Sequence, residues 1–181
     1  CLRSSYLETA YLLLFGHLPT QPQLARWHED IVHHRRIKFK IVDLLKCLPE
    51  QGHPMDALQA AVAALGMFYP GRNVQDVENN YWSAVRLVAK LPTIVAAWAR
   101  LRHGNEYIPP RDDLGFSENF LYMLTETEPL PLWSDIFDDC LILHAEHTMN
   151  ASTFTGMVTA STLADPYTVV ASSIGALKGP L

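Results

Sequence analysis

The sequence predicts an all-α protein folded as a single domain. Apolar residues recur three and four positions apart along most of the 181-residue chain, which is the period of an amphipathic helix. No segment shows the strict alternation that is typical of a half-buried strand. Proline and glycine fall mostly between the periodic segments, where they end helices and form turns. With 49% hydrophobic and 18% charged residues, the chain can build one sizeable core, but it is short for two domains.

The first two predicted helices have recognisable ends. Residues 5–15 carry an apolar stripe, and Gly16 closes the helix because glycine accepts the left-handed conformation found there. The second helix starts at Thr20, with Thr20 or the residue after it near the cap and Pro22 in the first turn. It ends in the basic run 33–36, whose charge complements the helix dipole and which we expect to be solvated.

Three more helices are predicted next along the chain. Residues 39–48 form a short helix that is stopped by Pro49. Residues 55–67 form an alanine-rich helix that allows a neighbour to approach closely. Residues 74–103 carry long apolar rows, but Pro92 interrupts them, so we expect a kink or two consecutive helices there.

Four shorter helices complete the chain. Paired prolines on either side of position 130 separate two of them, and Pro166 suits the first turn of the last one. The predicted segments are 116–124, 133–146, 152–163 and 165–177.

Composition indicates the cellular compartment and argues against some classes of partner. A formal charge of −5 and a pI near 5.9 argue against a nucleic-acid or anionic-membrane partner, since both favour a basic face. Cys1, Cys47 and Cys140 show no disulfide or zinc spacing, which suits a reducing compartment. No apolar run approaches the roughly 20 residues that span a bilayer. We therefore expect a soluble, cytoplasmic protein with no membrane or nucleic-acid partner.

The segment 141–155 carries the clearest chemistry. His144 and His147 are three positions apart, so one helix would place both imidazoles on the same face, and Asn150 and Ser152 follow within two turns. The residues alone leave three interpretations open: structural histidines at a helix end, a zinc site, or an anion pocket. Zinc is the weakest, because the only nearby cysteine is Cys140 and because His-Ala-Glu-His is not the His-Glu-x-x-His helix of zinc proteases. Imidazole and amide groups could instead hold a dicarboxylate.

Several segments together resemble one family. Residues 141–155 closely resemble the oxaloacetate-binding motif of citrate synthases, and 164–181 resemble the helix and turn that follow it in that family. The chain departs from common family patterns at 58–62, which reads Leu-Gln-Ala-Ala-Val, and at Tyr69-Pro70, where Asp-Pro is common. Further matching segments are Tyr6–Thr20, Gly52–Asp56 with its His-Pro-Met, Lys90–Val95 with its Pro-Thr-Ile, and Asp113–Leu124 with its Asn-Phe-Leu.

The resemblance implies a fold and a set of roles. Residues 1–181 would form part of the family's all-α large domain, truncated at both ends and without the small catalytic domain. His147 would contact oxaloacetate, with His144 either beside it or only supporting the pocket. Asn150 and Ser152 would orient a catalytic histidine expected just past Leu181. The other catalytic residues, an aspartate and a second histidine, cannot be placed in the chain, so catalytic residues are expected outside it.

The resemblance also implies a reaction. The family condenses acetyl-CoA, a co-substrate, with oxaloacetate and water to give citrate and CoA in the tricarboxylic acid cycle. It uses no metal or other cofactor and works as a homodimer. A fragment alone would be inactive.

Three alternatives to this reaction remain. A fragment of 2-methylcitrate synthase, which uses propionyl-CoA, would look the same here. A non-catalytic dimerisation module could use the small-residue stretches 57–66 and 160–179. A metal-binding helical domain built on His144 and His147 ranks lowest.

Overall fold

The computed structural model describes residues 4–70, 73–146 and 148–179, and all the regular structure in these ranges is α-helical. The all-α prediction is therefore confirmed. The helices are α1 (Tyr6–Phe15), α2 (Gln21–His34), α3 (Phe39–Lys46), α4 (Pro54–Phe68), α5 (Val77–Leu101), α6 (Phe116–Thr125), α7 (Pro131–His144), α8 (Ala151–Ala160) and α9 (Pro166–Ala176).

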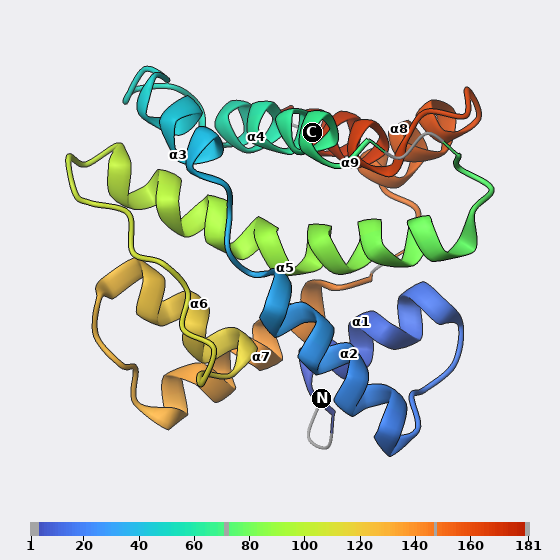
Figure 1. Ribbon diagram of the computed structural model, residues 1–181, viewed down its shortest axis with the longest axis horizontal. Coiled ribbons are helices and arrows are strands. Elements are labelled where there is room, and N and C mark those ends of the chain that lie inside the picture. The colour runs from blue at the N-terminus through green and yellow to red at the C-terminus, as the bar shows by residue number, and fades with distance from the viewer. Residues whose placement is uncertain (1–3, 71–72, 147, 180–181) are drawn as a thin grey trace.

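The long helix α5 runs through the middle of the molecule and separates two layers (Figure 1). On one side α3, α4 and α9 pack against it, and α8 joins this layer through extensive contact with α9. On the other side α2 and α6 pack against α5, while α1 and α7 contact each other and complete that layer. Helix α5 therefore organises the fold, because both layers bury their apolar faces on it.

Two hydrophobic clusters match the two layers. One lies between α5 and the α3–α4–α9 side and includes Ile41, Leu65 and Ile94, which are fully buried. The other lies among α1, α2 and α5, and Trp27 and Ile31 are its largest fully buried members. Burial of such side chains stabilises the fold by roughly 1.5–3 kcal/mol each.

Several helix ends are closed by capping side chains or by glycine. Ser5 caps α1, accepting from the Glu8 amide, and Gly16 ends the helix at φ 77°. His53 caps α4, since its Nδ1 accepts from the Met55 amide at 3.2 Å, and Asp165 caps α9. These caps satisfy backbone donors that have no partner within the helix.

Three expectations need correction. Helix α5 continues through Pro92, so the two-helix alternative is wrong. Helix α7 begins at Pro131 and ends at His144, two residues before the predicted end. Arg35 is 2% exposed rather than solvated, because its guanidinium donates to the carbonyls of Leu114 and Arg111. Within the described ranges, no helix is both long enough and apolar enough to cross a bilayer.

Candidate functional site

The candidate site is the connection between α7 and α8, residues 145–150, together with the first turn of α8. Helix α7 delivers the chain to this connection, and α8, held on α9, receives it. The connection therefore joins one helix of each layer (Figure 1).

His144 is the last residue of α7 and is exposed. Its Nδ1 lies 2.7 Å from the carbonyl oxygen of Cys140. A carbonyl only accepts hydrogen bonds, so Nδ1 carries the proton, and a neutral ring then presents a lone pair at Nε2. In that state the ring does not donate to a carboxylate; it donates through Nε2 only as an imidazolium.

The expected pairing of His144 with His147 on one helix face stays a prediction. Helix α7 ends at His144, and Ala145 and Glu146 lie outside it. His147, the other predicted substrate contact, lies outside the described residues.

Glu146 and Thr148 give the connection an unusual backbone. Thr148 has φ 86°, and its amide donates to Oε1 of Glu146 at 2.5 Å. A positive φ is unfavourable for a β-branched residue, so the surrounding structure must hold it there. Such conformations are concentrated at functional sites.

Asn150 and Ser152 begin α8. Asn150 is the N-cap, and its Oδ1 accepts from the Thr153 amide at 2.8 Å. The Oγ atom of Ser152 is buried and has no hydrogen-bond partner among the described groups. The Asn150 side chain is therefore used structurally, whereas the Ser152 hydroxyl can still donate to a further group. The first turn of α8 also directs backbone amides and the positive end of a helix dipole at this region.

A polar network under α5 was not predicted. Lys90, 3% exposed, donates from Nζ to the carbonyls of His34 and Arg36 at 2.6 Å each. Thr93 donates to the Arg35 carbonyl at 2.9 Å. These bonds fix the end of α2 to α5, and burial lowers the pKa of Lys90 to about 8. The Lys-Leu-Pro-Thr motif is visible in the sequence, but the hydrogen bonds of its Lys90 and Thr93 side chains depend on tertiary packing.

The described residues contain no group of three or more His, Cys, Asp or Glu side chains that could hold a metal ion. Cys140, the cysteine nearest to His144 in sequence, is exposed and free.

Comparison with known proteins decides the family. The family model described as "Citrate synthase, C-terminal domain" matches residues 1–181. The chain belongs to the citrate synthase family. It is 57% identical to the citrate synthase of a Synechocystis strain, over 98% of this chain and 45% of that protein. It is 49% identical to the citrate synthase of Acidithiobacillus ferridurans, over 98% of this chain and 47% of that protein.

A solved structure agrees with the sequence comparison. The crystal structure of citrate synthase from Pyrobaculum aerophilum superposes with a TM-score of 0.88 at 42% identity, covering 99% of this chain and 47% of that one. The resemblance in the sequence and the citrate-synthase-like fold are thus confirmed. The chain spans about half the length of the citrate synthases it matches.

Proposed function

We propose that the chain is part of a citrate synthase and that the complete polypeptide condenses acetyl-CoA with oxaloacetate and water to give citrate and CoA. The observation that carries this proposal is the 57% identity over 98% of the chain with a protein named citrate synthase. A resemblance limited to the fold would not suffice, because one fold supports many activities.

In this proposal the connection between α7 and α8 is the oxaloacetate side of the active site. His147 contacts oxaloacetate, and the first turn of α8 favours the negative charge of a dicarboxylate. The Nδ1 contact of His144 with Cys140 supports a positioning role for His144 rather than direct donation by a neutral ring. The free hydroxyl of Ser152 is suited to orient the catalytic histidine that the resemblance places beyond Leu181.

We further propose that the remaining catalytic groups belong to the other half of the enzyme. Condensation needs an aspartate to take the methyl proton, histidines to stabilise the enol and polarise the ketone, and arginines to hold the carboxylates, all positioned together. The resemblance assigns these groups outside residues 1–181. The 181 residues expressed alone should therefore release no CoA.

The same proposal includes a homodimer, and α8 offers a surface for it. Phe154, Met157 and Val158 are 61%, 56% and 53% exposed. Their spacing of three and four residues places them on one face of α8, whose main packing partner is α9. An exposed apolar face of this kind is typical of an interface.

Steady-state kinetics on the intact polypeptide that contains this chain tests the proposal. Acetyl-CoA with oxaloacetate should release CoA, and propionyl-CoA should be the poorer substrate; a preference for propionyl-CoA would instead indicate a 2-methylcitrate synthase. His147→Gln should reduce kcat/KM by roughly 10²-fold or more, while His17→Gln, at an exposed histidine just after α1, should have no effect. Equal rates for the two variants would overturn the assigned role of His147.

A further inference from the structure

Helix α7 carries His144 to the candidate site, but apolar packing alone does not fix its position. None of the residues of α7 is fully buried. The Phe137 ring stacks on Phe120 of α6 at a centroid distance of 4.9 Å. Between α7 and α5, however, lies a cavity of about 260 Å³, and Phe137, Leu141 and Val95 are among the residues that line it. Apolar contacts therefore constrain α7 less than a filled interface would.

Asp138 links α7 to the first turns of two other helices. Its Oδ2 accepts from the Tyr6 amide at 2.8 Å, and its Oδ1 accepts from the Ser117 hydroxyl at 2.6 Å. Tyr6 is the first residue of α1, and Ser117 is the second residue of α6. The Tyr6 ring centroid lies 5.0 Å from that of Phe116, so the starts of α1 and α6 adjoin. One carboxylate therefore connects three helices.

A carboxylate suits this position better than a neutral side chain. An ionised aspartate only accepts hydrogen bonds, so each of its two oxygens matches one of the two donors. The Tyr6 amide is among the amides at the start of α1 that have no partner within the helix. The first turns of α1 and α6 also carry the positive ends of two helix dipoles, which favour a negative group. Ser117 is 5% exposed and Asp138 is half-buried, so water competes only in part for these bonds.

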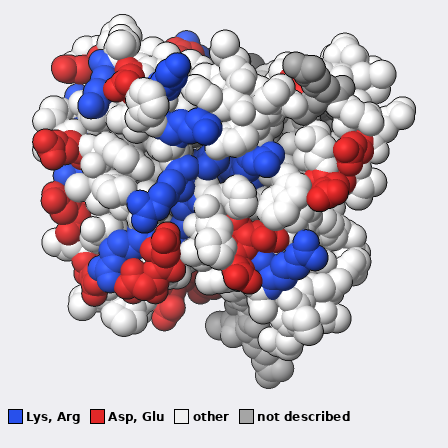
Figure 2. All heavy atoms as spheres, in the orientation of Figure 1, with Lys and Arg blue, Asp and Glu red and all other residues white. Residues whose placement is uncertain are grey.

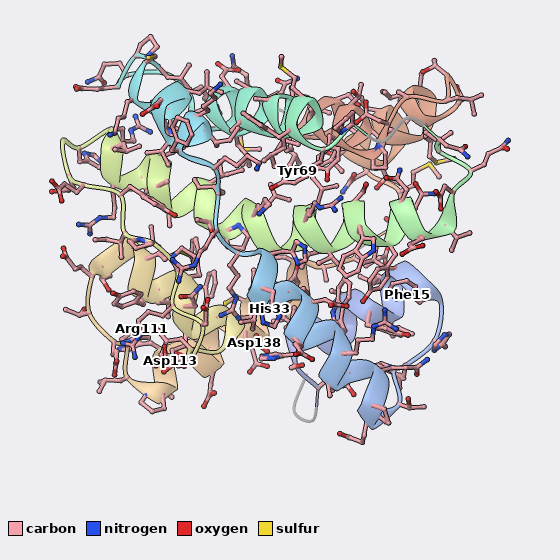
Figure 3. All side chains as sticks on the ribbon, in the orientation of Figure 1. Phe15, His33, Tyr69, Arg111, Asp113 and Asp138 are labelled. Carbon is pink, nitrogen blue, oxygen red and sulfur yellow. The ribbon has the colours of Figure 1, made fainter. Side chains whose placement is uncertain are left out.

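Asp138 differs from the carboxylates on the surface of the same layer. At the lower edge of the view in Figure 2, Asp and Glu side chains adjoin Lys and Arg side chains. Such exposed pairs hold the fold weakly, because water and salt screen them. Figure 3 shows Asp138 in the layer that contains α6 and α7, on the side of these helices toward α2. There it uses both oxygens between helices.

The position of α7 determines the geometry of the candidate site. Asp138 and His144 lie on this one helix, and between them Cys140 presents the carbonyl that the His144 Nδ1 contacts. The connection that follows contains the left-handed Thr148, whose amide donates to Glu146. A shift of α7 along its axis or around it would move the Cys140 carbonyl and the start of the connection together.

We infer that Asp138 is a positioning residue for the oxaloacetate side of the site. It holds α7 against the starts of α1 and α6, and through α7 it sets the placement of His144 and of the connection to α8. Its effect on the reaction rests on the proposed function. Because Asp138 acts on the substrate only through the helix, its loss should weaken oxaloacetate binding and leave acetyl-CoA binding nearly unchanged.

Steady-state kinetics of Asp138→Asn in the intact polypeptide tests this inference. The side-chain amide keeps the shape of the carboxylate but directs an N–H group at one of the two donors. We expect the KM for oxaloacetate to rise at least about fivefold and the KM for acetyl-CoA to change by less than about twofold. Ser117→Ala removes one of the two bonds and should change the oxaloacetate KM in the same direction by less. Asp139→Asn is the matched control, because Asp139 is the exposed neighbour on the same helix and loses the same charge.

Hydrogen exchange of the same variants, measured without substrate, separates this inference from the proposed function. Asp138→Asn should speed exchange about threefold or more in peptides that cover the start of α1 and residues 141–150, whereas Asp139→Asn should not. If the intact wild type releases no CoA, the proposed function fails, and exchange still decides whether Asp138 holds the connection.

Four results would overturn the inference: an unchanged oxaloacetate KM in Asp138→Asn, equal rises in both KM values, equal effects of the Asp138 and Asp139 variants, or unchanged exchange at residues 141–150. Equal rises in both KM values would indicate a general loss of structure. Should Asp138→Asn fail to fold, Ser117→Ala carries the same test, because it keeps the carboxylate and its bond to the Tyr6 amide.

Discussion

Lys90 is a buried cation whose ammonium group donates hydrogen bonds to two backbone carbonyls instead of to water. Thr93, three residues further along the same motif, donates from its hydroxyl to the Arg35 carbonyl. The end of α2 is thus attached to α5 by side chains one turn apart. Removing either attachment would leave buried carbonyls without donors, which costs about 1–3 kcal/mol each.

The charge on Lys90 predicts a pH effect on stability. Its pKa is lowered from 10.5 to about 8 in the folded protein. Below pH 8 both folded and unfolded states hold the proton, and the folded state bears the full cost of the buried charge. As the pH rises from 8 to 10.5 the folded state releases its proton first, so the Lys90 contribution to the free energy of unfolding rises by about 3 kcal/mol.

Urea unfolding of the wild type and of Lys90→Met across pH 7–11 measures this effect. The difference in unfolding free energy between the two proteins should move in favour of the wild type over that range. Tyrosines whose pKa is raised by burial, such as Tyr107 at about 12, affect both proteins alike. A difference that is flat with pH would contradict the buried-charge account.

At the scale of the helix, local signals predicted where most elements lie. Capping residues such as Ser5 and Asp165, and the glycine after α1, mark ends that depend only on nearby backbone donors and carbonyls. The end of α7 could not be predicted in this way, because no glycine or proline follows His144. Helix α5 continues through Pro92 because packing of α5 against both layers offsets the loss of one helical hydrogen bond, which the sequence pattern could not show.

Asp165 provides a test of capping at α9. Its Oδ1 accepts from the Tyr167 and Thr168 amides, and its Oδ2 accepts from the Thr168 hydroxyl at 2.7 Å. Asp165→Ala should lower the free energy of unfolding by about 1–2 kcal/mol, whereas Asp165→Asn should recover most of it because an amide oxygen still caps. Thermal or chemical unfolding measures both, and identical losses would show that capping is not the cause.

The candidate site could be predicted only in part. The sequence located His144, Asn150 and Ser152 in one segment, and the structure keeps the latter two at the start of α8. The left-handed Thr148 and the unpartnered Ser152 hydroxyl depend on tertiary packing and leave no signal in the sequence. The burial of Arg35 likewise depends on carbonyls supplied by residues 111 and 114, far along the chain.

At the scale of the whole molecule, the exposed face of α8 predicts association. Phe154→Glu combined with Val158→Glu places two charges on that face and should convert a dimer to a monomer in sedimentation velocity. Leu18→Glu, at another exposed leucine, should leave the dimer intact. Persistence of the dimer in the double variant, or a wild type that is already monomeric, would contradict this interface.

The central claim is that these 181 residues supply the oxaloacetate side of a citrate synthase whose other catalytic groups lie elsewhere in the polypeptide. Its most direct test is CoA release with acetyl-CoA and oxaloacetate, measured on the intact polypeptide and on the 20.4 kDa chain alone, with the mass of each verified. The account predicts citrate and CoA from the intact polypeptide and none from the chain alone. Turnover by the chain alone, or none by the intact polypeptide, would contradict it.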